Sequence, residues 1–271
     1  MAISGSAIFL STILLEKNRS NGKGPSLLVS DWIEPIGEAG FAGVDLWLNH
    51  LRLSSRSEWQ LIKDLSGDSD LKLTSISAVI PADSSDKSQK LREAVVEACA
   101  YFLPDRLKFS VAEDGRSRGL SASLLDSLEF IKNWSRDLPR ETGMLFDGGP
   151  NQIGADSLAQ LRKLLDGKRY QAALHPFLMS QTEFASALKA AGDFLGNLGV
   201  QAKEAEEWIL LEDKTDEYTK IISTARKGFQ GTWTLECTKG VGRPTENIDN
   251  LFDNAEKDLN FLNEIILKSG R

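Results

Sequence analysis

Short apolar runs alternate with longer amphipathic stretches along the whole of this 271-residue chain, and this alternation is the feature that most constrains its fold. Runs rich in aliphatic and β-branched side chains predict eight strands, at residues 6–15, 42–48, 71–80, 106–112, 142–147, 169–174, 198–202 and 231–236. Apolar runs that are nearly continuous suit parallel strands whose two faces are both covered by helices. The chain is therefore expected to be an α/β protein.

The stretches between these runs carry helical patterns. Apolar residues at 91, 95, 98 and 102 share one face of a helix expected over 86–102. Ser180, followed three residues later by Glu183, predicts a capping box at the start of another helix, over 180–196. Further helices are expected over 26–40, 121–138, 155–167, 215–229 and 247–267.

The number and length of these units favour one fold over its main alternative. Eight strand–helix units of about 34 residues each are typical of a (β/α)₈ barrel. An open doubly wound sheet would normally carry a glycine-rich turn after its first strand, and the segment EKNRSNGKGP at 16–25 lacks the G-x-G-x-x-G spacing. No linker or low-complexity tract divides the chain, so we predict a single TIM barrel domain over residues 1–271.

Charge and apolar run length bear on partners and location. The formal net charge of −7 disfavours nucleic acid and anionic membrane as partners, because both need a basic surface. The first apolar run has no basic residue before it and is interrupted by Ser11 and Thr12, so it predicts a strand rather than a signal peptide. Cys99 and Cys237 have no metal-ligand spacing and suggest a reducing compartment. A cytoplasmic protein is expected, and self-association into a homo-oligomer is left open.

Polar residues at the carboxyl ends of the expected strands are the candidate site residues, because the active sites of such barrels lie at that end. Taken singly, each is as readily a helix cap or a solvated loop residue as a functional group. Together they favour a site, in which His50, Asp147, His175 and Glu236 are expected to point into one pocket. The full set is Glu16, Asn49, His50, Glu113, Asp114, Asp147, His175, Gln201, Lys203 and Glu236, which includes both histidines of the chain.

The segment AGFAGVDLWLNHL at 39–51 resembles the second strand of xylose-isomerase-like TIM barrels, a family that includes sugar-phosphate isomerases, epimerases and AP-endonuclease-type proteins. The shared pattern is a glycine, a hydrophobic pair, an acid and, shortly after, a histidine. The ends of the fifth, sixth and eighth expected strands fit the same family. The resemblance therefore extends over nearly the whole chain.

The resemblance implies a divalent metal site. In that family a glutamate, an aspartate, a histidine and a glutamate on strands 5 to 8 hold the metal. The matching positions here are Asp147, His175, Gln201 and Glu236, of which only the last is unchanged. Aspartate, histidine and glutamate are good metal ligands, whereas a neutral amide contributes less charge. A weakened site for Mn²⁺, Mg²⁺, Zn²⁺ or Co²⁺ is expected.

The loop TKGVGRP at 238–244 is expected to bind an anionic or polyhydroxylated ligand. Gly240 and Gly242 free backbone amides there, and Lys239 and Arg243 add positive charge. The alternative is a solvated turn in which Arg243 pairs with a nearby acid such as Glu246.

The resemblance implies an isomerase or epimerase that acts on a sugar or a related hydroxy-carbonyl compound. Glu236 and Asp147 would hold the metal, and one of them would also act as base. Lys203 or Lys239 would stabilise a developing enolate oxygen. The expected substrate-binding residues are Trp47, His50, Glu113, Lys239 and Arg243. Trp233, at a strand centre, is expected to pack in the core.

Other functions remain open at this stage. A non-catalytic barrel that binds a metabolite or a partner subunit is the main alternative, because the metal-ligand set departs from the family pattern. A lyase or hydrolase on the same barrel is not separable from an isomerase by sequence. DNA-repair endonuclease activity is disfavoured, because such enzymes use a histidine-rich cluster that two histidines cannot supply.

Glu236 raises a physical question of its own, because a carboxylate buried at a strand end needs a compensating partner. Three sources are open. The first is a metal shared with Asp147 and His175, the second is a lysine such as Lys203 or Lys239, and the third is an amide donor such as Gln201.

Overall fold

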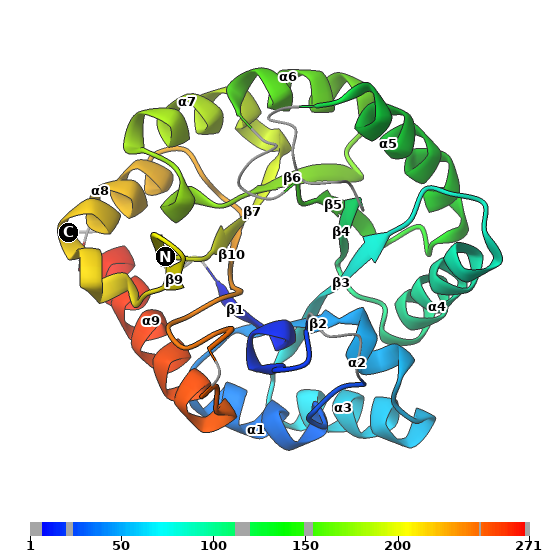
Figure 1. Ribbon diagram of the computed structural model, residues 1–271, viewed down its shortest axis with the longest axis horizontal. Coiled ribbons are helices and arrows are strands. Elements are labelled where there is room, and N and C mark those ends of the chain that lie inside the picture. Colours follow the sequence, from blue (N-terminus) through cyan, green and yellow to red (C-terminus); the bar gives the residue numbers. More distant parts are fainter. Residues whose placement is uncertain (1–6, 20–23, 112–119, 149–153, 244, 269–271) are drawn as a thin grey trace.

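Eight parallel strands close into a barrel in the computed structural model, which describes residues 7–19, 24–111, 120–148, 154–243 and 245–268 (Figure 1). Around the barrel the strands follow the order β1, β2, β3, β4, β5, β6, β7 and β10. Their bounds are Ile8–Ser11, Gly43–Trp47, Lys72–Ile80, Arg106–Val111, Gly143–Phe146, Tyr170–Leu174, Leu195–Val200 and Thr232–Leu235. The barrel closes where Ile8 of β1 pairs with Trp233 of β10. The predicted (β/α)₈ barrel is confirmed.

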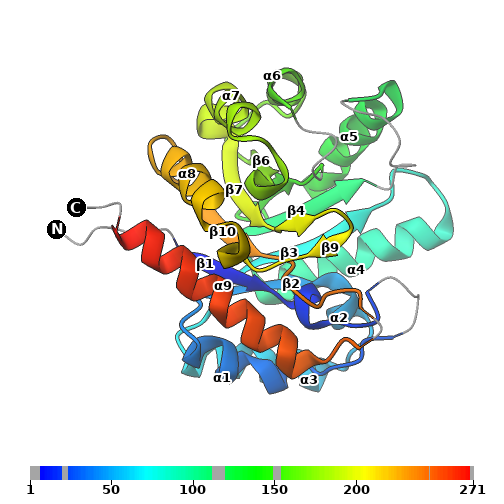
Figure 2. The same ribbon diagram turned by 60° about the vertical axis from the view of Figure 1, so that its left-hand side comes forward.

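Helices form the outer ring (Figure 1). Their bounds are Ser30–Glu38 for α1, Leu48–Arg52 for α2, Arg56–Asp68 for α3, Asp86–Phe102 for α4, Ala122–Trp134 for α5, Ala155–Leu164 for α6, Gln181–Ala191 for α7, Thr215–Arg226 for α8 and Ile248–Lys268 for α9. Figure 2 shows α9 along the outside of the barrel, and both views place it between α8 and α1. Trp32 of α1 packs against Phe252 of α9 with ring centroids 5.2 Å apart.

The core lies between the strands and this outer ring, where the apolar faces expected from the sequence are buried. Val95, Ala98 and Phe102 of α4 are all buried. Ser180 and Glu183 form the predicted capping box at the start of α7. Trp233 of β10 is buried in the core, as expected from its place at the centre of a strand.

The structure differs from the sequence-based prediction in several places. Helix α3 was not expected, because few of its side chains are apolar and its buried face includes Glu58 and Ser66 beside Trp59 and Ile62. Strand β7 begins at Leu195 rather than 198, because Gly196 and other small or polar residues break the apolar run.

Two further differences lie just beyond the carboxyl ends of β1 and β7. Strand β1 is short because the chain turns into a 3₁₀ helix, η1, at Thr12–Leu15. After β7, the short strands β8 (Lys203–Glu204) and β9 (Glu207–Trp208) form an antiparallel hairpin. In the part of the chain that the structure describes, no helix has both the length and the apolar character needed to span a membrane.

Candidate active site

A cavity of about 220 Å³ opens at the carboxyl-terminal mouth of the barrel. Its wall is built by residues at or just beyond strand ends, which is where active sites of this fold occur. The lining includes a thiol and serine hydroxyls, at Cys237, Ser11, Ser77 and Ser110, and six further side chains with polar or charged groups: Asp45, Trp47, Lys108, Asp147, Gln201 and Glu236. The cavity is therefore the candidate active site.

Asp147, His175 and Glu236 meet at the floor of this mouth. Each is the first residue after its strand, so the parallel barrel brings all three to the same end. One ligand atom from each lies within 4.8 Å of the others. His175 Nε2 lies 2.8 Å from Asp147 Oδ1, and His175 Nδ1 lies 3.6 Å from Glu236 Oε2. This group could hold a metal ion in the sense that its donor atoms are of suitable types and close together.

Lys108 is a functional residue that the sequence analysis missed, as it missed Asp45. It lies on β4 between the buried residues Leu107 and Phe109, and its side chain is itself buried. Its ammonium forms an ion pair with Glu236, and its Nζ lies 3.3 Å from Asp147 Oδ2. A lysine within an apolar strand is a signal that could have found it, because a buried lysine requires carboxylate partners.

Glu236 is held by two donors. Lys108 Nζ donates to its Oε1, and the Gln201 side-chain amide donates to its Oε2. Gln201 thus acts as a hydrogen-bond donor to the carboxylate. Of the three sources left open for compensating Glu236, the structure supplies the amide, and it supplies a lysine other than the two expected.

The carboxylates at the floor of the cavity stabilise the protonated forms of Lys108 and His175. Burial lowers the pKa of Lys108, but the carboxylates of Glu236, Asp147 and Asp45 outweigh burial, so the pKa is raised above its usual value. The balance is the same for His175, because burial is outweighed by Asp147 and Glu236 and its pKa is raised. Lys108 is therefore an ammonium rather than a free amine, and it can act as a hydrogen-bond donor but not as a nucleophile.

Asp45 lies deeper, on β2. Ser11 and Ser75 donate to its two oxygens, each over 2.7 Å. Burial raises the pKa of Asp45, while Lys108 and the two serine hydroxyls oppose that rise. Asp45 is thus a third acid near the lysine, after Glu236 and Asp147, and it is held in place by its neighbours on β1 and β3.

His50 does not join the other residues in the cavity. It is buried, and its Nε2 donates to Glu16 Oε2 over 3.0 Å. The hydroxyl of Thr12 lies 3.0 Å from His50 Nδ1 and accepts a hydrogen bond from the backbone amide of Trp47 over 2.9 Å. The ring of His50 stands edge-on to Trp47, with centroids 5.2 Å apart. The expected convergence of His50 with Asp147, His175 and Glu236 is therefore not what the structure shows, because α2 places it behind Trp47.

Glu16 anchors this group behind Trp47. Burial raises the pKa of Glu16, but hydrogen bonds from His50, Ser26 and Asn18 outweigh it and lower the pKa to about 2. Glu16 is therefore a charged acceptor. It fixes the position of His50, whose ring packs against Trp47. Trp47 itself lines the cavity.

Among the described residues, the remaining expected site residues do not line the cavity. Lys203 pairs with Glu206 over 3.0 Å and lies over the ring of Trp208. Lys239 lies 3.5 Å from Asp213, and Arg243 pairs with Glu207. The partner expected for Arg243, Glu246, pairs instead with Arg19 over 2.7 Å. Glu113 and Asp114 fall outside the described residues.

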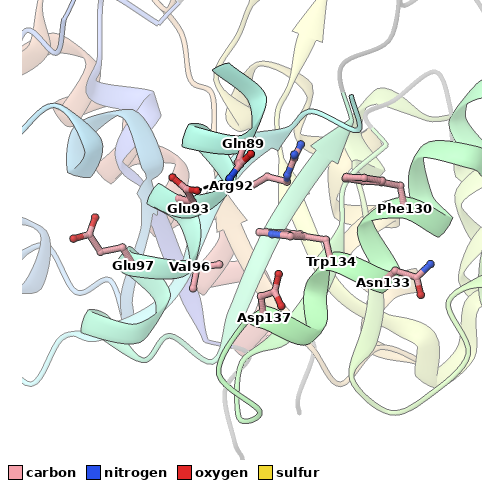
Figure 3. Close-up of a pocket in the computed structure, with 9 residues that line it drawn as sticks. All are labelled: Gln89, Arg92, Glu93, Val96, Glu97, Phe130, Asn133, Trp134 and Asp137. Atoms are coloured by element: carbon pink, nitrogen blue, oxygen red, sulfur yellow. Dashed lines mark hydrogen bonds between the residues drawn. The ribbon is translucent and has the colours of Figure 1, made fainter. Parts of the chain in front are cut away.

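A wider groove of about 710 Å³ lies on the outer ring between α4 and α5 (Figure 3). Its cation is already engaged, since Arg92 donates to the carbonyl oxygens of Pro81 and Asp83 and stacks 5.0 Å from the ring of Phe130. Gln89 donates to Glu93 over 2.9 Å. The groove has a larger volume than the mouth cavity, but Arg92, Gln89 and Glu93 in its lining are engaged in local contacts.

No protein-family model and no curated protein matches this sequence. Solved structures do match over almost the whole chain. A D-psicose 3-epimerase from Clostridium cellulolyticum H10, solved with D-tagatose, is 12% identical with a TM-score of 0.71, over 96% of this chain and 99% of that one. A probable 3-DHS dehydratase from Bacillus anthracis is 15% identical with a TM-score of 0.69, over 94% and 98%.

A third match is a xylose-isomerase-like TIM barrel protein from Mycobacterium smegmatis in complex with magnesium. It is 13% identical with a TM-score of 0.65, over 96% of this chain and 98% of that chain. At these identities the likeness shows the fold. The chain has the fold of xylose-isomerase-like TIM barrels, as the resemblance of its second strand and strand ends indicated.

Proposed function

We propose that this protein is an isomerase or epimerase that acts on a small, sugar-like hydroxy-carbonyl compound in the mouth cavity. The observation that carries the proposal is the group of two carboxylates, one imidazole and one ammonium at the floor of a cavity of about 220 Å³. Two of the similar structures, the epimerase with D-tagatose and another solved with D-fructose, bind compounds of this class.

Reactions of this kind remove a proton from the carbon beside a carbonyl group and return it at another position or face. They need a base at the carbon and a positive group at the oxygen that becomes an enolate. Asp147 is the better-placed base, because its side chain is 16% exposed whereas that of Glu236 is 7% exposed. Both carboxylates are engaged, Asp147 by His175 and Lys108 and Glu236 by Lys108 and Gln201. The greater exposure of Asp147 therefore decides the assignment, and Glu236 is assigned to holding the lysine in place.

Lys108 is the group proposed to stabilise the enolate oxygen. An ammonium carries three N–H donors, so a lysine that engages two carboxylates can still donate to a ligand oxygen. Its position in the cavity lining puts it within reach of a bound carbonyl compound. In this role it replaces Lys203 and Lys239, which were expected from the sequence but do not line the cavity.

A divalent metal fits this site only in part. Asp147, His175 and Glu236 are suitable ligands in kind, and His175 Nδ1 is a buried nitrogen without a hydrogen-bond partner among the described residues. Against this, the Lys108 ammonium already contacts the carboxylates of Glu236 and Asp147. The arrangement as it stands does not fit a metal at these oxygens, and no step of the proposed chemistry passes through one.

The proposal is tested by solvent exchange at carbon. The protein is incubated in D₂O with a panel of ketoses, aldoses and their phosphates, and NMR follows deuterium entering the carbon beside the carbonyl group. We expect exchange with at least one compound, and loss of that exchange in Asp147→Asn. The matched control is Asp193→Asn, because the side chain of Asp193 is 86% exposed and lies on the outer ring.

The second candidate function is a non-catalytic barrel that binds a metabolite. It is favoured because Lys108, Asp147, His175 and Glu236 already pair with one another and need no substrate to balance their charges. If a compound of the panel binds saturably but neither reacts nor exchanges deuterium, this candidate replaces the enzyme. All eight strands close one barrel, which supports treating residues 1–271 as one domain in either case.

A further inference from the structure

We propose that the Lys108 ammonium takes the place of a divalent metal at the floor of this barrel and excludes one from it. Asp147, His175 and Glu236 are then residues of metal-ligand type, and the Lys108 ammonium supplies the positive charge that a metal ion would otherwise supply. The inference concerns the same cavity as the proposed function, but the exclusion of metal does not depend on turnover.

The first support is that the lysine and a metal would compete for the same two carboxylates. Lys108 Nζ contacts Glu236 Oε1 and lies 3.3 Å from Asp147 Oδ2. Both residues belong to the group whose donor atoms lie within 4.8 Å of one another. A metal bound by these carboxylates would lie close to the ammonium, and two cations at that separation repel strongly in a buried site.

The second support is that Lys108 has little freedom to move aside. Its backbone is paired on both sides within the barrel, with Ser77 of β3 and Leu145 of β5. Its neighbours Leu107 and Phe109 are buried, and Lys108 itself is 6% exposed. Moving the ammonium away from both carboxylates would bury a charge without its partners, which is strongly unfavourable.

The third support is the close packing around the cluster. A Cβ atom added at Gly199 of β7 would lie 2.5 Å from His175 Nδ1 and 2.9 Å from Glu236 Oε1. The imidazole and the carboxylate therefore pack directly against the backbone of Gly199. Gln201 adds a donor to the second oxygen of Glu236. The cluster is thus enclosed by the protein with the lysine as its cation.

The same geometry predicts what removal of the lysine would do. Lys108→Met keeps a side chain of similar length and removes the charge. Two carboxylates and an imidazole would then face one another with one positive charge fewer, and these are the ligand types that bind Mn²⁺ or Co²⁺. The variant is expected to gain a metal site that the natural protein lacks.

The experiment is a metal titration without substrate. Wild type, Lys108→Met and Lys108→Gln are treated with chelator, desalted and titrated with MnCl₂ while electron paramagnetic resonance follows free Mn²⁺. We expect no saturable site in the wild type below about 1 mM. Lys108→Met is expected to bind one Mn²⁺ per chain at least about 100-fold more tightly, with a melting temperature that rises on Mn²⁺ addition. Lys72→Met is the control, because Lys72 is an exposed strand lysine at the opposite end of the barrel.

Several outcomes would overturn the inference. One is a wild-type protein that binds one Mn²⁺ per chain at micromolar concentration. Another is the absence of any gain in Mn²⁺ affinity in both folded Lys108 variants. If the variants do not fold alone, they are refolded with and without Mn²⁺, and failure of the metal to rescue folding counts against the inference. If the wild type exchanges no deuterium with any compound of the panel, the proposed function is wrong. The metal titration still tests the exclusion of metal by Lys108.

Discussion

Replacing Glu236 by glutamine is the most direct test of how the floor of the cavity is held together. The change removes the carboxylate that pairs with Lys108 and leaves Asp147, 3.3 Å away, as the carboxylate partner of the buried ammonium. Breaking a buried ion pair from one side costs about 3–5 kcal/mol. Because Asp147 retains part of the interaction, we expect the free energy of unfolding to fall by about 2–4 kcal/mol.

The loss is measured by urea denaturation and by thermal melting, in the presence of chelator. A domain of this size loses about 2–4 °C of melting temperature per kcal/mol, so a fall of roughly 4–16 °C is expected. Glu206→Gln is the matched control. It breaks an ion pair whose carboxylate is 94% exposed, and it should change stability by less than about 0.5 kcal/mol.

A double variant isolates the pair itself. Lys108→Met removes the stranded ammonium, so Glu236→Gln combined with Lys108→Met should be more stable than Glu236→Gln alone. A Glu236→Gln variant that melts with the wild type would refute the reasoning, because it would mean that the ion pair carries no stability. A double variant no better than the sum of the single changes would refute the coupling between the two residues.

Three further predictions concern other parts of the molecule. Burial raises the pKa of Asp258 on α9 to about 7, so its carboxyl group keeps a proton in the folded protein that it loses above about pH 4 in the unfolded chain. The contribution of Asp258 to stability therefore falls as the pH rises from about 4 to 7. Asp258→Asn should remove this fall and be more stable by roughly 2–4 kcal/mol at pH 8, as urea titrations across that range would show. Burial is outweighed by hydrogen bonds at Glu16, which lower its pKa to about 2, so its stabilising contribution is full above about pH 4.5 and is lost as the pH falls toward 2. The stability difference between wild type and Glu16→Gln should therefore shrink on acidification, and a constant difference would contradict the assignment. Gly199→Ala should lower stability by more than about 2 kcal/mol, because its methyl group would lie 2.5 Å from the His175 ring, whereas Gly154→Ala, with open space around it, should not.

The fold could be predicted because the barrel demands the same pattern many times. Each strand is covered by helices on one face and by core on the other, so each appears as an apolar run whatever its detailed sequence. Asp147, His175 and Glu236 were found for a related reason. Each directly follows an apolar run, and all parallel strands of a barrel end at one mouth. Helix α3 was missed because packing rather than apolar periodicity defines it.

The rest of the site depends on side-chain directions that periodicity does not encode. Lys108 lies at a strand centre, where only the barrel interior explains a polar residue between Leu107 and Phe109. His50 follows its strand as expected, yet the five-residue helix α2 directs it toward Glu16. Lys203 lies on the β8–β9 hairpin, whose two-residue strands have no apolar pattern that would predict them. His50 and Lys203 lie away from the cavity because local contacts fix them elsewhere, the ion pair with Glu16 for His50 and the β8–β9 hairpin for Lys203.

Closure of the barrel has a consequence for the growing chain. Ile8 of β1 finds its partner in Trp233 of β10, so the first strand cannot complete its hydrogen bonds until almost the whole chain has been made. Until then β1 and β7 present open edges, and such edges invite pairing with other chains. Contacts between residues so far apart in sequence slow folding. Synthesis of residues 232–235 is therefore the step that ends this exposure, and α9 then covers the join between the first and last parts of the chain.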